Sequence, residues 1–170
     1  MGRAATVLLL LAGLWLSGCA GYQLGPTDGT AAGARSIQVV PFLNETLEPR
    51  LTDAVTAGLR KEFQRDATFR LDTHGEADVV LTGKIINYQR RAQSLAPRDL
   101  ATARDYRLEI TAQITARERT TGRILTEQPV TGMTLLRVGD DLVSSERQAL
   151  PLLANDLARR VVSVLADGTW

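Results

Sequence analysis

The sequence predicts an α+β domain in which about four strands form a mixed, mostly antiparallel sheet with two amphipathic helices packed on it. Three patterns lead to this fold class: one long stretch in which apolar and polar residues alternate strictly, and two stretches with apolar residues at helical spacing. The first helical stretch follows a short apolar strand, and the second lies close to the C-terminal end. We therefore expect a single domain over residues 36–168.

The domain begins with a strand and a helix. Ile37, Val39 and Phe42 mark the strand, and Pro41 predicts an edge position or a bulge because proline has no N–H to donate to a ladder. Pro49 favours a helix start. The apolar face of that helix is formed by Leu51, Ala54, Val55, Leu59 and Phe63.

Strands dominate the middle of the chain. Phe69 and Leu71 predict a short strand, and the apolar residues that open the stretch 79–91 predict a longer one. Residues 106–116 alternate between apolar and polar without exception, which is typical of a strand with one buried face. Between these last two strands we expect a long loop over residues 94–104.

A hairpin and a helix complete the domain. Gly122 lies in a short link suited to a hairpin turn, so residues 124–138 are expected to return antiparallel, with their proline at an edge or a bulge. Ser145 and Gln148 resemble a capping box. The apolar face that follows is formed by Ala149, Leu153, Leu157, Val161 and Val164. Pro151 requires that this helix either starts later than Ser145 or bends in its first turns.

Residues 1–18 have the features of a bacterial lipoprotein signal peptide. Arg3 supplies positive charge, the apolar core that follows is too short to span a bilayer, and small residues precede Cys19. We expect acyl chains on Cys19, followed by a tether over residues 19–35; the alternative is an ordinary signal peptide with a chance cysteine. In lipoproteins of the common Gram-negative type, an aspartate directly after the cysteine favours retention in the inner membrane, whereas Ala20 follows Cys19 here. The resemblance to these lipoproteins therefore implies the periplasmic face of the outer membrane.

The composition argues against several classes of function. Lys and Arg total 20 and Asp and Glu total 19, so removal of Arg3 leaves a neutral protein without the basic surplus of a nucleic-acid binder. The sequence has no nucleophile near a plausible base, no glycine-rich phosphate loop and no cluster of residues at metal-ligand spacing. His74 is expected in a solvated loop. We therefore expect a protein that is not an enzyme, uses no cofactor or metal, and acts through its surfaces.

Five short segments, residues 21–24, 37–46, 77–85, 106–108 and 121–125, carry a family resemblance through their order and spacing. Together they resemble the LptE family of lipopolysaccharide-assembly lipoproteins. The resemblance implies a domain that plugs the lumen of an LptD-like outer-membrane β-barrel, helps that barrel to assemble and binds lipopolysaccharide on its way to the outer leaflet. A neutral domain with polar faces of mixed charge is a reasonable filling for the polar lumen of a barrel.

Four arginines are candidates for lipopolysaccharide binding because guanidinium groups pair bidentately with phosphate oxygens. They are Arg90, Arg91, Arg98 and Arg137. Arg90 and Arg91 end a predicted strand beside the loop that carries Arg98, so these three guanidinium groups are expected to converge at one end of the sheet. Solvated arginines, or arginines in contact with the barrel wall, are the alternative.

A second resemblance leads to a different function. Residues 39–42 also resemble periplasmic lipoproteins of the curli-secretion and peptidoglycan-synthase-activator type, which are a secretion-pore subunit and an enzyme activator. The partner distinguishes the two interpretations. A large outer-membrane barrel favours the first, and a peptidoglycan synthase or a homo-oligomeric ring favours the second.

Overall fold

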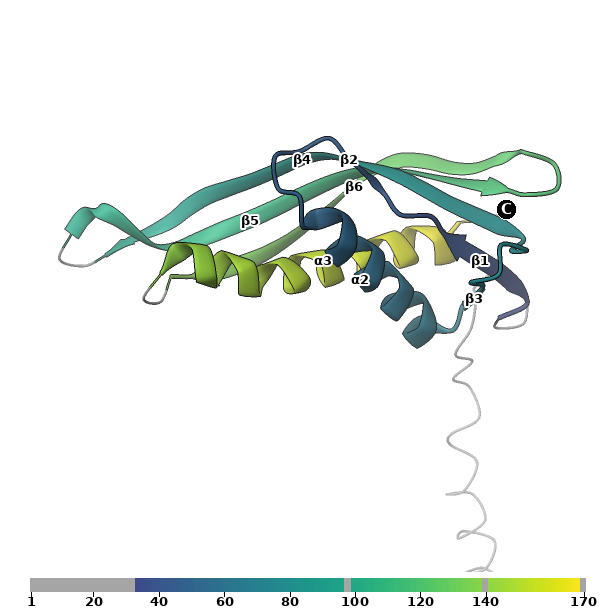
Figure 1. Cartoon of the computed structure of the whole chain (residues 1–170), viewed down its shortest axis with the longest axis horizontal. Coiled ribbons are helices and arrows are strands. Elements are labelled where there is room, and N and C mark those ends of the chain that lie inside the picture. Colours follow the sequence, from purple (N-terminus) through teal and green to yellow (C-terminus); the bar gives the residue numbers. More distant parts are fainter. Residues whose placement is uncertain (1–32, 97–98, 139–140, 169–170) are drawn as a thin grey trace, which may run out of the picture.

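The structure is a computed structural model that describes residues 33–96, 99–138 and 141–168. It consists of a curled sheet with two helices on the same face (Figure 1). In chain order the elements are β1 (Arg35–Val39), β2 (Leu43–Asn44), α2 (Leu51–Asp66), β3 (Phe69–Leu71), β4 (Val79–Ala96), β5 (Asp99–Glu118), β6 (Ile124–Arg137) and α3 (Leu142–Ala166). The α+β class is confirmed, and the described sheet has six strands in place of about four.

The sheet is mixed because its two halves are built differently. β1 lies between β3 and β4 and runs parallel to both, and α2 connects this region to β3. β4, β5 and β6 follow as antiparallel neighbours, which gives the order β3-β1-β4-β5-β6. The alternation in β5 is confirmed, because every second residue of one set is fully buried: Leu108, Ile110, Ala112, Ile114 and Ala116.

The chain leaves the sheet around Pro41 and then returns to it. β1 pairs with the start of β4, and β2 pairs with Lys84 and Ile85 on the same edge of β4. Pro41 therefore marks an interruption of an interior strand rather than an edge strand, and its missing N–H falls between two ladders. Phe42 fills the interruption. Its ring lies against Gly83, where an added Cβ would lie 2.5 Å from a ring atom.

The hairpin of β4 and β5 is longer than the sequence predicts. The expected loop over residues 94–104 is wrong for most of its length, because β4 continues to Ala96 and β5 starts at Asp99. This end of the hairpin projects beyond the helices (Figure 1). A strand segment that faces no helix has no reason to alternate apolar and polar residues, so the sequence lacks the usual signal there.

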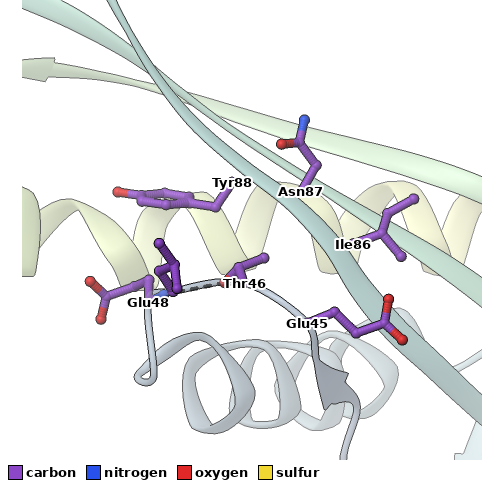
Figure 2. A pocket seen from close by; sticks show the side chains of 7 residues that line it. Glu45, Thr46, Glu48, Ile86, Asn87 and Tyr88 are labelled. Atoms are coloured by element: carbon purple, nitrogen blue, oxygen red, sulfur yellow. Dashed lines mark hydrogen bonds between the residues drawn. The ribbon is translucent and has the colours of Figure 1, made fainter.

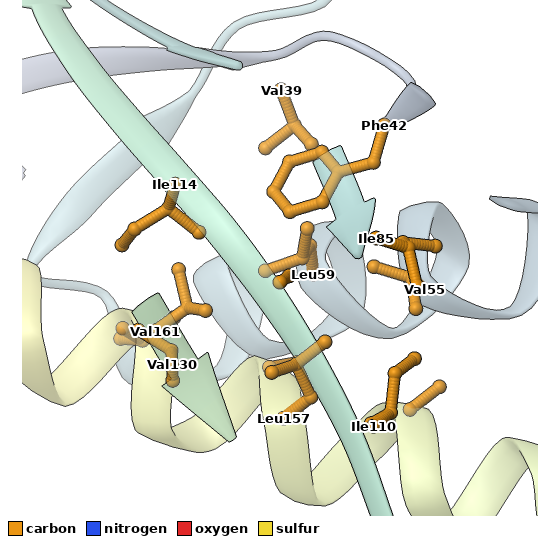
Figure 3. Packing of buried hydrophobic residues seen from close by; sticks show 14 of the residues in the cluster. Val39, Phe42, Val55, Leu59, Ile85, Ile110, Ile114, Val130, Leu157 and Val161 are labelled. Carbon is orange, nitrogen blue, oxygen red and sulfur yellow. The ribbon is translucent and has the colours of Figure 1, made fainter. Parts of the chain in front are cut away.

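Both helices present apolar faces to the sheet and to each other. The large side chains buried on these faces are Leu51, Val55, Leu59 and Phe63 of α2 and Leu150, Leu153, Leu157, Val161 and Leu165 of α3. Figure 3 shows several of them packed against Ile85, Ile110 and Ile114 of the sheet. Gly132 allows the edge strand β6 to approach α3 closely, since an added Cβ would lie 2.6 Å from the backbone N of Leu157.

Helix α3 begins earlier than expected. Asp141 is the N-cap, and its carboxylate accepts the N–H groups of Val143 and Ser144 at 3.2 and 2.8 Å. The expected cap at Ser145 is wrong: its hydroxyl instead donates to the Asp141 carbonyl at 2.7 Å. Pro151 consequently lies inside the helix at an exposed position, where water can reach the carbonyl that it leaves without a partner.

Candidate binding surfaces

Arg90 points toward the helices and is engaged there. Its Nη1 donates to Glu146 Oε2 of α3 at 2.5 Å, and its guanidinium carbon lies 5.6 Å from the centre of the Tyr106 ring. The Tyr88 hydroxyl donates to the other oxygen of Glu146. Burial and then this hydrogen bond raise the pKa of Tyr88, so its hydroxyl remains a proton donor. Arg90 therefore helps to hold the start of α3 against β4.

Arg91 lies on the opposite face of the sheet, which no described helix covers. Its guanidinium donates to Gln89 Oε1 at 3.0 and 2.7 Å, and it has no ion pair among the described residues. Arg107 stands directly across the ladder from it. Arg107 Nη1 lies 4.0 Å from Glu109, its Nη2 donates to Gln93 Oε1 at 3.4 Å, and its buried Nε has no hydrogen-bond partner in the described part of the chain. Two neighbouring guanidinium groups with unused donors suit a phosphate or a carboxylate.

Arg137 belongs to the same face of the sheet. It pairs across the ladder with Asp105, two residues beyond the pairing of Arg107 with Leu135, and its Nε donates to Asp105 Oδ1 at 3.0 Å. Cross-strand neighbours and diagonal neighbours on one face lie within reach of long side chains. Arg91, Arg107 and Arg137 therefore form one set, which we call the arginine cluster.

The structure thus combines two of the predicted arginines with one that the sequence analysis missed. Arg90 is on the other face, so the expected convergence of Arg90 with Arg91 is not observed. Arg98 and Cys19 lie outside the described residues. Leu135 of β6 lies beside the arginine cluster with 69% of its surface exposed, so an apolar side chain accompanies the positive charges.

A hollow of about 380 Å³ lies between the segment before α2 and β4 (Figure 2). Its lining consists of Glu45, Thr46, Leu47, Glu48, Ile86, Asn87 and Tyr88. Asn44 fixes the segment, since its Oδ1 accepts the Thr46 N–H at 2.9 Å and its Nδ2 donates to the Glu48 carbonyl at 2.8 Å. A well-braced turn therefore holds Leu47, which is fully exposed, beside the bulged residue Ile86 of β4.

A second hollow, of about 340 Å³, lies where α2, α3 and β6 meet. Asp156 accepts the Met133 N–H at 2.9 Å and side-chain bonds from Arg159 and Arg160 at 3.0 and 2.9 Å. Burial alone would raise the pKa of Asp156, but these hydrogen bonds outweigh it and lower the pKa. The charged carboxylate thus satisfies a backbone donor on the outer edge of β6, which is a structural role.

Other kinds of site are not found in the described ranges. No three His, Cys, Asp or Glu side chains there lie close enough together to hold a metal ion. None of the described helices is long and apolar enough to cross a membrane. His74 is exposed, as expected, and its Nδ1 lies 3.5 Å from Asp72. Among the described residues, the arginine cluster and the hollow beside β4 are the candidate binding surfaces.

A family model for lipopolysaccharide assembly, LptE, matches residues 34–165. The match begins one residue before β1 and ends one residue before the end of α3, so it includes every described strand and helix apart from that last residue. A comparison with curated proteins finds no match.

Solved structures resemble this fold at low sequence identity. A Xanthomonas campestris protein has a TM-score of 0.60 at 10% identity, over 86% of this chain and 91% of its own. A Chlamydia trachomatis protein has a TM-score of 0.56 at 10% identity, over 78% and 96%. A minor lipoprotein of Acinetobacter baumannii has a TM-score of 0.50 at 13% identity, over 78% and 92%. At such identities the likeness concerns the fold alone.

Proposed function

The chain belongs to the LptE family of lipopolysaccharide-assembly lipoproteins, a non-enzymatic family, and from this premise we propose a role at the outer membrane. In this proposal acyl chains on Cys19 anchor the protein at the periplasmic face, the domain plugs an LptD-like β-barrel, and it helps to bind lipopolysaccharide and deliver it to the outer leaflet. The family match over residues 34–165 is the observation that carries the proposal.

The composition of the uncovered sheet face supports a place inside a barrel. Along β5 this face carries Glu109, Thr111, Gln113, Thr115 and Arg117, so it is polar and mixed in charge. The lumen of a large barrel is polar as well. An affinity-tagged chain co-expressed with the LptD-like barrel of the same bacterium should co-purify with it. Recovery of a peptidoglycan synthase, or of a ring of copies of the chain, would support the alternative interpretation instead.

The arginine cluster supports binding of lipopolysaccharide. Lipid A carries phosphate groups, which arginine forks bind bidentately, and Leu135 adds an apolar contact for an amphiphile. Replacing Arg91 and Arg107 together by Gln should weaken the binding of purified lipopolysaccharide by about tenfold or more without lowering the melting temperature. Arg117→Gln, on the same face of β5 but at its far end, is the matched control. Unchanged affinity in a folded double variant would refute this assignment.

The lipid anchor has its own test. Cys19→Ala should remove labelling by radioactive palmitate and release the protein from the membrane, because lipoprotein processing requires the thiol and two or more acyl chains are needed for firm anchoring. Label that persists on the Cys19→Ala protein would exclude Cys19 as the attachment site.

A further inference from the structure

The second half of β4 has an open edge. β5 pairs with β4 as far as Ala96, but on the other side β1 and β2 together reach only to Ile85. Beyond that point no described strand pairs with this edge, and the hairpin continues well past β2 and the segment before α2 (Figure 1). An exposed row of backbone N–H and C=O groups is a template for one more strand.

The ladder shows which backbone groups are available. The Ile85 carbonyl accepts the Glu45 N–H at 2.9 Å, so the backbone groups of Ile85 face the open side. Along a strand, the backbone groups of successive residues face its two neighbours in turn. The bulge at Ile86 shifts this alternation by one residue, so that the backbone groups of Gln89 and Arg91 face β5. The groups that face the open edge are consequently those of Tyr88, Arg90 and Ala92.

The hollow of Figure 2 lies at the beginning of this open edge. Leu47 and Ile86 offer it apolar surface, since Leu47 is fully exposed and Ile86 is 45% exposed. The two acidic residues differ: Glu45 pairs with Lys84 at 3.4 Å, whereas Glu48 has no ion pair within the described chain. The hollow therefore suits an apolar side chain that is accompanied by a basic one.

We propose that an extended segment of the barrel partner adds to this edge of β4 as a further strand, with an apolar side chain on Leu47 and Ile86 and a basic side chain at Glu48. The identity of the partner rests on the proposed function; the geometry of the edge does not. A second copy of this chain fits this edge poorly. If the open edges of two copies paired antiparallel around this point, Arg90 and Arg91 would lie opposite the same arginines of the other copy, and like charges directly opposite each other are destabilising.

Proline substitution tests the edge with little change in side chains. Ala92→Pro removes an N–H that faces the open edge, so the full-length chain should keep its melting temperature and bind the barrel partner about tenfold more weakly. Ala92→Ser keeps the N–H and should bind like the wild type. Arg91→Pro removes an N–H directed at β5 and should lower the melting temperature. Equal binding by Ala92→Pro and the wild type would overturn the proposal.

Hydrogen exchange separates strand addition from contacts between side chains. In the complex with the barrel, the amides of Tyr88, Arg90 and Ala92 should become protected, whereas those of Gln89 and Arg91 should be protected with or without the barrel. A complex that forms without this alternating gain refutes strand addition and leaves the proposed function standing. A wild-type chain that does not bind the barrel refutes both.

Two further experiments test which chain binds to the open edge of β4. Leu47→Ser should weaken barrel binding at unchanged melting temperature, whereas Ile124→Ser, an exposed apolar residue on the far hairpin, should not. If the chain alone forms a dimer in analytical ultracentrifugation and Ala92→Pro abolishes that dimer, the occupant is a second copy and the proposal is wrong.

Discussion

Replacing Gly132 by Ala should destabilise the domain by separating α3 from β6. The added Cβ would lie 2.6 Å from the Leu157 N and 2.8 Å from its Cα, against at least 3.4 Å for an ordinary contact. The two elements would therefore have to move apart by about 3.4 minus 2.6, or 0.8 Å. No rotation of a side chain relieves the contact, because the atoms that are met are the backbone N and Cα of Leu157 and its Cβ, which is fixed to that backbone.

The magnitude follows from what the separation disturbs. Overpacking in a well-packed core costs about 1–3 kcal/mol, and the neighbouring bond from the Met133 N–H to Asp156 adds about 1 kcal/mol if it is lost. A total of about 2–4 kcal/mol corresponds to a fall in melting temperature of about 8–16 °C for a domain of this size. Thermal unfolding followed by circular dichroism measures it, with the exposed neighbour change Thr131→Ala as the control.

Gly83 provides the contrast that tests the reasoning. A Cβ at Gly83 would meet ring atoms of Phe42 at 2.5–2.7 Å, so the obstacle is a side chain. Gly83→Ala should be destabilising alone and partly rescued by Phe42→Leu, whereas Leu157→Ala should not rescue Gly132→Ala. A Gly132→Ala protein that melts like the wild type, or that Leu157→Ala restores, would show that the described distance between β6 and α3 is wrong.

Three further predictions concern the sheet. Leu108→Asp should unfold the domain, because a buried unpaired carboxylate costs several kcal/mol, whereas Glu109→Ala on the uncovered face should cost little; equal melting temperatures would invert the assignment of faces. Asp78 accepts hydrogen bonds from the side chain and the backbone N–H of Ser36, and these bonds, the side-chain bond first, lower the pKa of Asp78 below its value in the unfolded chain. The stability that charged Asp78 gives to the folded domain is therefore fully present above about pH 4 and is lost as the pH falls through the folded pKa. Asp78→Asn should cost about 1 kcal/mol at pH 7, and urea titrations at pH 7 and pH 3 should show a smaller loss of stability on acidification than in the wild type. Deleting the bulged Ile86 should leave a folded domain, because the residues on either side of it already pair in register with β5. Deleting Thr111 should unfold the domain, because the side chains of part of β5 would then point to the wrong face of the sheet; circular dichroism distinguishes the two variants.

The sequence predicts those elements whose residues face the core. The alternation from Tyr106 to Ala116 and the helical spacing from Leu51 to Phe63 both report burial, and both are confirmed. The end of the β4–β5 hairpin was missed because its strands project past the helices and need no apolar face. The predicted start of α3 is wrong because Ser145 and Gln148 match a capping motif by spacing, while Asp141 makes the actual cap bonds.

The arginine cluster could be predicted only in part. The chemistry of their side chains predicts Arg91 and Arg137, but only the pairing register shows that Arg107 stands opposite Arg91. Adjacent residues of a strand point to opposite faces of the sheet. The expected convergence of Arg90 with Arg91 therefore conflicts with the prediction that both residues lie in one strand. The period of two residues therefore separates Arg90 from Arg91.

The period alone would still have placed the two arginines on the wrong faces. Counting by twos from the buried Ile85 assigns Arg91 to the helix side, but Ile86 is an extra residue opposite β5, and beyond it the helix side is occupied by Tyr88 and Arg90. The same bulge leaves Arg91 on the uncovered face, and β2 pairs no further than the residue before it. One unpaired residue therefore determines which arginine is available for an anion, and the open edge of β4 begins at the same place in the ladder.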